Sequence, residues 1–229
     1  MRVLDLFAGL KGWSSAFDHD VRTLDIEPKF DCDITLDILD FEPDIHLQDW
    51  KPDLILASPP CNAFSVASIG HHWKGGVGAY IPKSDFAVLS KEIVKRTLAV
   101  IEELDPMFWI LENPVGVLRK MPFMKGIERR TVTYCQYGEN RMKPTDLWGG
   151  FPASLRLEPP CRNGEPCHEA APRGSRKGTQ GLKNVALRAI IPYQLSFDVK
   201  EAAEKDHSAG KRHIKHPTLL DYLVKGSNA

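Results

Sequence analysis

Two reactive side chains follow apolar runs, and together they could carry out covalent catalysis. Cys61 lies in SPPCNAFS (58–65), directly after the apolar run 53–58, and a thiol held in a proline-stiffened turn is a candidate nucleophile. A lone cysteine is more commonly a small buried hydrophobe, which is the alternative for Cys61. Glu112 ends the next apolar run, ILEN. If both runs are parallel strands, the two side chains face one cleft, where a carboxylic acid beside a thiol could combine nucleophilic attack with proton donation.

A glycine-bearing turn near the start of the chain is a candidate nucleotide-binding loop. AGLKG (8–12) follows the apolar run VLDLF (3–7), and Asp25 ends the next such run, where its carboxylate could accept hydrogen bonds from ribose hydroxyls. Lys11 interrupts the glycine pattern that cradles a pyrophosphate in dinucleotide-binding proteins. The turn therefore favours an adenosyl ligand without phosphates.

The elements that would position these residues alternate between short apolar and longer amphipathic segments, a pattern typical of βαβ units. We expect an α/β, Rossmann-like fold with a mostly parallel sheet and a small irregular appendage. The expected strands are 3–7, 21–25, 33–38, 53–58, 107–113, 129–138 and 145–151, and the expected helices are 13–17, 85–104, 199–206 and 218–224. Residues 61–84 and 152–185 are expected to be loops, the first a candidate functional lid.

The net charge of zero hides an asymmetry along the 229 residues. Residues 1–60 carry 5 basic and 13 acidic side chains, whereas residues 61–229 carry 25 basic and 17 acidic ones. Basic residues concentrate in 119–143 and 173–188, so a neutral chain could still present a phosphate-binding face, although scattered solvated charge is the alternative.

No stretch approaches ~18 apolar residues, and the N-terminal segment is not typical of a signal peptide, so we expect a cytoplasmic protein without a membrane segment.

The five cysteines fit a reducing compartment better than a disulfide framework. Cys161, Cys167 and His168 have the spacing C-x5-C-H, but zinc needs four ligands, usually from sharper pairs. Cys135 could be the fourth ligand, yet nothing in the sequence places it nearby. We therefore expect loop thiols and no metal site.

Three motifs in one order give the chain a family resemblance. DLFAGLKGW, SPPCNAFS and ILENP resemble the cofactor loop, the Pro-Cys nucleophile motif and the Glu-Asn motif of the carbon-5 cytosine-specific DNA methyltransferases. The match covers about residues 1–150, and RAIIPYQL (188–195) resembles the last family motif, which returns to complete the cofactor pocket. The resemblance implies methyl transfer from S-adenosylmethionine to carbon 5 of a flipped cytosine in double-stranded DNA, through a covalent cysteine adduct.

The resemblance also implies a role for each matching residue. The catalytic set would be Cys61, Glu112, Pro60 and Asn113. The cofactor set would be Phe7, Ala8, Gly9, Leu10, Asp25, Ile26, Asp37, Ile38 and Pro59. The nucleic-acid set would be Ser65, Gln136, Arg141 and Lys143, with His71, His72 or Lys74 as further candidates in the loop.

The chain departs from the family pattern at several positions. Lys11 replaces a usual glycine, Asn62 a common glutamine and Pro114 a usual valine, and no Gln-x-Arg-x-Arg motif is present. We divide the chain into a catalytic core (1–150), a minimal basic insert or recognition region (151–187) and a C-terminal return to the core with a tail (188–229). Because the insert is small, we expect a monomer whose sequence specificity is short, relaxed or supplied by a partner.

Three alternatives to DNA methylation at carbon 5 stay open. The same chemistry could act on RNA, since one branch of the family methylates transfer RNA. A non-catalytic module that binds S-adenosylmethionine or DNA would also keep the fold, although the presence of both Cys61 and Glu112 argues against it. An amino-group methyltransferase is disfavoured because such enzymes usually place Asp or Asn, not Ser58, before the two prolines.

Overall fold

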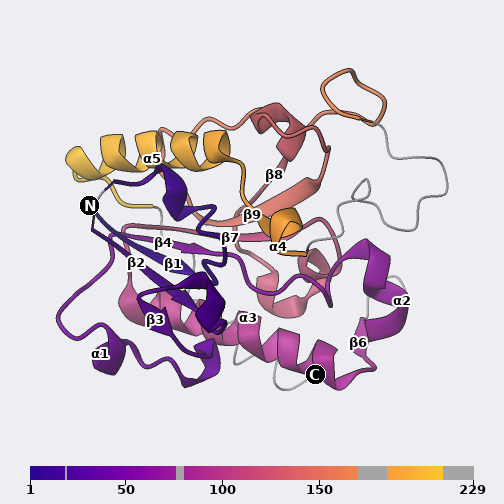
Figure 1. Cartoon of the computed structure of the whole chain (residues 1–229), viewed down its shortest axis with the longest axis horizontal. Helices are drawn as coiled ribbons and strands as arrows, with labels where there is room; N and C mark the ends of the chain where they lie inside the picture. The colour runs from indigo at the N-terminus through magenta and orange to yellow at the C-terminus, as the bar shows by residue number, and fades with distance from the viewer. Residues whose placement is uncertain (19, 76–79, 170–184, 214–229) are drawn as a thin grey trace.

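The computed structural model describes residues 1–18, 20–75, 80–169 and 185–213. A seven-stranded sheet forms its centre, with strand order β3-β2-β1-β4-β7-β9-β8 (Figure 1). β3, β2, β1, β4 and β7 are mutually parallel, and β9 runs antiparallel to both β7 and β8. The strands are β1 (Arg2–Leu6), β2 (Asp20–Asp25), β3 (Ile34–Thr35), β4 (Leu54–Ala57), β7 (Phe108–Pro114), β8 (Arg129–Thr133) and β9 (Pro144–Gly150). The expected α/β, Rossmann-like fold with a mostly parallel sheet is confirmed.

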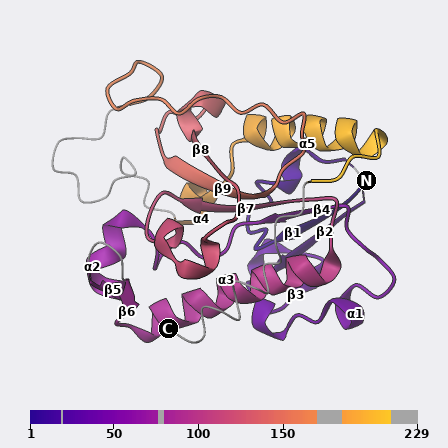
Figure 2. The same cartoon turned by 180° about the vertical axis from the view of Figure 1, so that it is seen from behind.

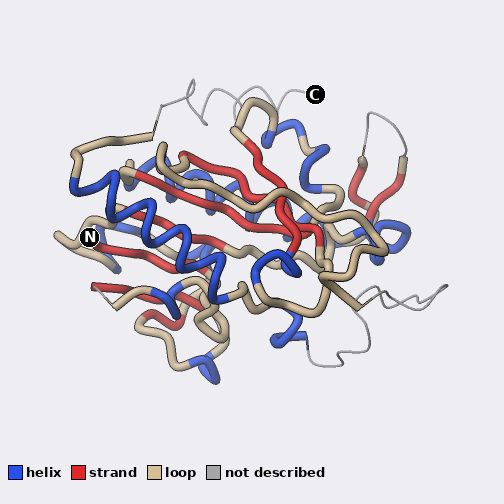
Figure 3. Tube along the Cα trace, turned by 90° about the horizontal axis from the view of Figure 1, so that it is seen from above, coloured by secondary structure: helices blue, strands red, loops and turns tan. Residues whose placement is uncertain are grey.

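Helices cover both faces of this sheet. α3 (Asp85–Leu104) lies along one face and α5 (Tyr193–Ser208) along the other, with the sheet between them in both side views (Figures 1 and 2). Seen from above, α5 crosses over the strands (Figure 3). The remaining helices are short: α1 (Pro43–His46), α2 (Ile69–His72) and α4 (Val185–Ala189), with 3-10 turns η1 (Ser14–Ala16), η2 (Pro28–Phe30), η3 (Ile38–Asp40), η4 (Val66–Ser68), η5 (Leu118–Lys120), η6 (Pro122–Met124) and η7 (Tyr134–Tyr137). No helix among these described residues is long and apolar enough to cross a membrane.

The pleat of the central strands divides the core into two layers. Ile55 of β4 and Leu111 of β7 pack in the layer that contains the apolar face of α3, whereas Leu56 and Ile110, their neighbours in sequence, pack in the layer that contains α5. Side chains alternate between the faces of a strand, so continuous apolar runs are what a sheet buried on both sides requires. The carboxyl ends of β1, β4 and β7 then open at one edge.

One expected element has the predicted bounds and several others differ. α3 has the bounds that the sequence predicts, with Ser84 as N-cap accepting a hydrogen bond from the Ala87 amide. The expected strand 129–138 ends at Thr133, where η7 begins, and the expected helix 13–17 is only the 3-10 turn η1. The expected loop 61–84 contains η4, α2 and two short antiparallel strands, β5 (Trp73–Lys74) and β6 (Ile81–Pro82). The expected helix 218–224 lies outside the described residues.

A buried carboxylate joins the antiparallel end of the sheet. Asp146 of β9 is fully buried, accepts two hydrogen bonds from the Arg119 guanidinium (2.8 and 2.6 Å) and one from the Thr131 hydroxyl of β8 (2.7 Å). Arg129 lies 3.8 Å from the same carboxylate. Arg119 and Arg129 belong to the basic segment that the sequence predicts as a phosphate-binding face, but in the fold they compensate a buried charge.

We predict that Arg119→Ala lowers the free energy of unfolding by about 3 kcal/mol, because it leaves the buried Asp146 charge without its bidentate partner. Lys120→Ala is the matched control, since this neighbouring basic side chain is exposed and its loss should cost less than about 0.5 kcal/mol. Urea unfolding of both variants measures the difference. Equal stabilities would contradict a structural role for Arg119.

Candidate active site

The turn after β1 is held by the carboxylate of Asp25. The Gly9 amide donates to Asp25 Oδ2 (2.9 Å) and the Glu27 amide donates to Asp25 Oδ1 (2.9 Å), which joins the loop after β1 to the loop after β2. Phe7, Gly9 and Lys11 all adopt left-handed conformations, with φ of 62°, 50° and 58°. The left-handed conformation of Lys11 explains why glycine is usual at this position in the family that the motifs resemble, because left-handed backbone is costly for a residue with a Cβ.

A pocket opens beside this turn, at the carboxyl edge of the sheet. Most of the predicted cofactor residues line it, together with Pro60 and residues of the C-terminal return. Its lining is Asp5, Phe7, Ala8, Gly9, Leu10, Gly12, Trp13, Asp25, Ile26, Glu27, Phe30, Ser58, Pro60, Ala186, Ala189, Ile190 and Ile191. Gly12 is required by close approach, since a Cβ there would lie 2.6 Å from the Ile191 amide nitrogen.

Three predicted cofactor residues do not line the pocket. Ile38 is buried in the core layer that contains α3. Asp37 caps η3, accepting a hydrogen bond from the Leu39 amide (3.0 Å), and Pro59 lies between two pocket residues without lining the pocket itself. Sequence reasoning missed Glu27 and Phe30, although both lie within five residues of Asp25.

The pocket is acidic, which restricts what it could bind. Asp5, Asp25 and Glu27 line it, and its lining contains no lysine or arginine. Asp5 is fully buried apart from this opening, and burial raises its pKa to about 7, while hydrogen bonds from Ser14 oppose the rise. Such a lining suits a neutral or cationic ligand and disfavours a pyrophosphate.

The Cys61 turn is fixed to the strand beside it. The amides of Phe64 and Ser65 both donate to the Cys61 carbonyl (3.0 Å each), and the Val117 amide donates to the Phe64 carbonyl (2.8 Å). Asn113 is fully buried and its side-chain amide donates to the Pro59 carbonyl (3.0 Å). Asn113 is therefore placed to position the Cys61 turn against β7 rather than to touch reacting atoms.

Glu112 is buried among polar partners. Its side chain is 4% exposed, the Tyr134 hydroxyl donates to Oε1 (3.0 Å), and Lys143 Nζ lies 3.8 Å from the same oxygen. Burial raises the pKa of Glu112, and Lys143 and hydrogen bonds from Tyr134 and Ser58 oppose this rise. Burial therefore makes the charged form of this carboxyl group more costly than it is in water.

The charge of Glu112 affects the pKa of the Cys61 thiol. Burial raises the pKa of the half-buried Cys61 thiol, the negative charge of Glu112 raises it further, and the cations Lys143 and Arg188 lower it. Cys61 follows β4 and Glu112 lies near the carboxyl end of β7, and these strands pair in parallel, so both residues lie at the edge of the sheet where Ser58 and Pro60 line the acidic pocket. Arg188 is a member of this site that the sequence did not predict.

The four residues predicted to contact nucleic acid lie in different surroundings. Arg141 is 5% exposed and its guanidinium pairs with Glu139 (2.6 and 3.0 Å), so we remove it from the expected DNA contacts. Lys143 faces Glu112 and lies over the Tyr134 ring. Ser65 is half-buried with its hydroxyl 2.9 Å from that of Ser68. Gln136 donates to Cys167 Sγ (3.5 Å) and so belongs to a separate cysteine cluster, described below.

Comparisons with known proteins find two informative relatives. No protein-family model matches the chain. The chain is 29% identical over 183 residues to a frog virus 3 (isolate Goorha) protein named "Probable DNA (cytosine-5)-methyltransferase", covering 72% of this chain and 79% of that protein. It is 28% identical over 148 residues to the type II methyltransferase M1.HphI of Haemophilus parahaemolyticus, covering 57% of this chain but only 36% of that enzyme.

Solved structures give weaker similarities. One is a protein from an E. coli prophage described as a DNA modification methyltransferase (TM-score 0.47, 17% identity, 65% of this chain and 46% of that one). Another is Spodoptera frugiperda DNMT2 (TM-score 0.40, 17% identity, 69% of this chain and 53% of that one). The chain thus spans about half the length of these structures, and the fold assignment rests on its own sheet order.

We predict that Asp5 makes stability fall as pH rises. The folded state keeps the Asp5 proton up to about pH 7, whereas the unfolded state loses it near 3.8, so the stabilisation is present at low pH and is lost on the way to neutrality. From pH 5 to pH 8, the stability of Asp5→Asn relative to the native sequence should rise by about 2–3 kcal/mol, since one pKa unit corresponds to about 1.4 kcal/mol. Urea unfolding at both pH values measures this, and a pH-independent difference would contradict the raised pKa.

Proposed function

Because the chain belongs to the carbon-5 cytosine-specific DNA methyltransferase family, we propose that it transfers a methyl group from S-adenosylmethionine to carbon 5 of cytosine in DNA, through a covalent Cys61 adduct. The observation that carries this proposal is that Cys61 and Glu112 lie at the carboxyl ends of the paired parallel strands β4 and β7, joined by the Asn113–Pro59 hydrogen bond, at the sheet edge where the acidic pocket opens. A nucleophile and a buried acid at one sheet edge are the groups that addition to a pyrimidine ring needs.

The pocket lining fits S-adenosylmethionine. That molecule carries positive charge on its sulfonium and ammonium groups, which suits a lining with three acidic side chains and, among the described residues, no lysine or arginine. Ile26 and Leu10 offer exposed apolar surface for the adenine ring, and the Asp25 carboxylate retains lone pairs for ribose hydroxyls. When bound, S-adenosylmethionine supplies the methyl group as an electrophile.

Cys61 and Glu112 would divide the activation of cytosine. The Cys61 thiolate adds to carbon 6, forming a carbon–sulfur bond, while Glu112 gives a proton to N3 and so neutralises the charge that develops in the ring. The electron pair displaced from the 5,6 double bond makes carbon 5 nucleophilic, and this carbon would take the methyl group as the bond between the methyl carbon and the sulfonium sulfur breaks, with S-adenosylhomocysteine as the leaving group. Loss of the carbon-5 proton to water then restores the double bond as Cys61 leaves, and N3 returns its proton to Glu112.

Five neighbours would support these two residues. Lys143 and Arg188 oppose the unfavourable effect of burial on the Cys61 thiolate. Tyr134 orients the Glu112 carboxyl through its hydroxyl group. Pro60 shapes the pocket beside the nucleophile, and Asn113 positions it by binding the Pro59 carbonyl.

A stacked base could not reach Cys61. Carbon 5 and carbon 6 of a paired cytosine lie within the duplex, whereas the Cys61 thiol lies in a half-buried turn, so the proposal includes extrusion of the target base from double-stranded DNA. Ser65, four residues beyond Cys61, is a candidate for a contact to the DNA backbone near that base, with His71, His72 or Lys74 as further candidates in the same loop. We place the activity in the cytoplasm, with the chain acting as a monomer or with a partner that supplies sequence specificity.

We predict that tritium from labelled S-adenosylmethionine enters DNA but not transfer RNA, and that Cys61→Ala abolishes incorporation because it removes the nucleophile. Glu112→Gln should lower the rate by about 100-fold or more, since an amide cannot supply the proton to N3. Cys32→Ala is the matched control, because Cys32 is a half-buried thiol that does not line the pocket, and it should retain full activity.

Each other outcome would change the proposal in a defined way. Incorporation only into transfer RNA would reassign the substrate, and full activity of Cys61→Ala would overturn the covalent mechanism. Binding of S-adenosylmethionine or DNA without any transfer would indicate a non-catalytic module.

A further inference from the structure

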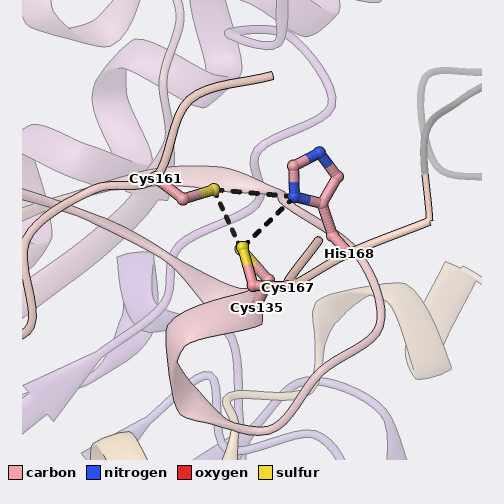
Figure 4. Close-up of side chains that lie close together, drawn as sticks. All are labelled: Cys135, Cys161, Cys167 and His168. Atoms are coloured by element: carbon pink, nitrogen blue, oxygen red, sulfur yellow. Dashed lines mark hydrogen bonds between the residues drawn. The ribbon is translucent and has the colours of Figure 1, made fainter. Parts of the chain in front are cut away.

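A cluster of metal-ligating side chains lies outside the proposed active site. Cys135 comes from η7, whereas Cys161, Cys167 and His168 come from the insert that follows β9. Their four ligand atoms all lie within 4.8 Å of one another, and the side chains point toward one another (Figure 4). Residues 26 positions apart in sequence are thus brought to one point by the fold.

The separations match those of a tetrahedral zinc site. Cys135 Sγ lies 3.1 Å from Cys161 Sγ and 3.7 Å from Cys167 Sγ, and His168 Nδ1 lies 3.7 Å from Cys161 Sγ and 3.5 Å from Cys167 Sγ. Zn–S bonds of about 2.3 Å and Zn–N bonds of about 2.0–2.1 Å imply ligand separations of about 3.5–3.8 Å at tetrahedral angles. Three of the four distances lie in this interval.

The composition of the cluster favours a metal over a disulfide. All three cysteines are free thiols in the structure. A disulfide between any two of these cysteines would not explain why the third thiol and the His168 imidazole lie beside it. Three thiolates and one imidazole, in contrast, form the four-ligand Cys3His set of structural zinc sites. Soft sulfur ligands in tetrahedral geometry select zinc among the common divalent ions.

The surroundings of the cluster include supporting hydrogen bonds. The Gln136 side-chain amide donates to Cys167 Sγ (3.5 Å), and the Cys161 amide donates to the Thr133 hydroxyl (3.0 Å). Hydrogen bonds of this kind orient the ligands of metal sites. His168 presents Nδ1 to the sulfurs, and its Nε2 is buried.

The insert needs such a fixed point. Residues 152–169 contain neither helix nor strand, and so short a segment cannot form a hydrophobic core of its own. Besides the cluster, hydrogen bonds from the Glu158 amide to the Tyr137 hydroxyl (2.9 Å) and from the Glu169 amide to the Asn140 carbonyl (2.9 Å) tie the insert to the segment after β8.

We propose that Cys135, Cys161, Cys167 and His168 bind one structural Zn²⁺ ion, which fastens the insert to η7. This replaces the sequence-based expectation of metal-free loop thiols. Cys135 follows Tyr134, whose hydroxyl binds Glu112, so the metal would also stabilise the support of the proposed catalytic acid. The proposal does not depend on the reaction that the chain catalyses.

We predict one zinc ion per chain in the purified full-length protein, measured by elemental analysis. Cys161→Ser and Cys167→Ser should each lose this zinc, whereas Cys32→Ser and Cys61→Ala, which alter the two thiols outside the cluster, should keep it. Protein loaded with Co²⁺ should show the thiolate-to-metal absorption of a tetrahedral site, and its intensity should fall in Cys161→Ser.

A measurement on the unaltered chain covers the case in which the ligand variants fail to fold. Removal of zinc by a chelator should lower the melting temperature, and addition of Zn²⁺ alone should restore it. Zinc far below one ion per chain after exposure to excess Zn²⁺ and gel filtration would overturn the proposal. Zinc retained in both serine variants, or a mass two hydrogens lighter that shows a disulfide within the cluster, would overturn it as well.

Discussion

The site depends on burying a carboxyl group beside a thiol. Glu112 is almost completely removed from water, and this burial raises the pKa of its carboxyl group. The pKa of the Cys61 thiol is raised by its own burial and, to a lesser degree, by the negative charge of Glu112. The protein compensates with cations at close range, Lys143 beside Glu112 and Arg188 near Cys61. The remainder of the site serves to hold this arrangement: Tyr134 orients the acid, and Asn113 joins the nucleophile turn to the neighbouring strand.

Much of the fold and part of the site could be predicted from the sequence, because they follow from local patterns. Continuous apolar runs predict strands buried on both faces, and the capping serine and the helical period predict α3 with its observed bounds. The order of the motifs likewise predicts that Cys61 and Glu112 lie at one edge of the sheet, since Cys61 follows β4, Glu112 lies near the end of β7, and these strands pair in parallel. These predictions need only the rule that the carboxyl ends of parallel strands lie at the same edge of the sheet.

Features that depend on contacts between distant segments could not be predicted. The proximity of Cys135 to Cys161 requires the insert to fold back on η7, and no pattern in the sequence encodes that path. The burial of Ile38 in the core and of Arg141 beside Glu139 depends on tertiary packing, which neither the motif nor the charge of these residues reveals. Counting basic residues also could not reveal that Arg119 and Arg129 compensate the buried Asp146.

The central claim is that Cys61 forms a covalent bond to carbon 6 of the target cytosine, and a trapping experiment tests it most directly. A duplex containing 5-fluorocytosine cannot complete the reaction, because the fluorine at carbon 5 cannot leave as a proton does. Incubation with S-adenosylmethionine should yield a stable protein–DNA complex whose modified peptide, identified by mass spectrometry, carries the nucleotide on Cys61. A trapped nucleotide on any other residue, or a chain that methylates ordinary DNA without trapping the fluorinated duplex, would contradict the mechanism.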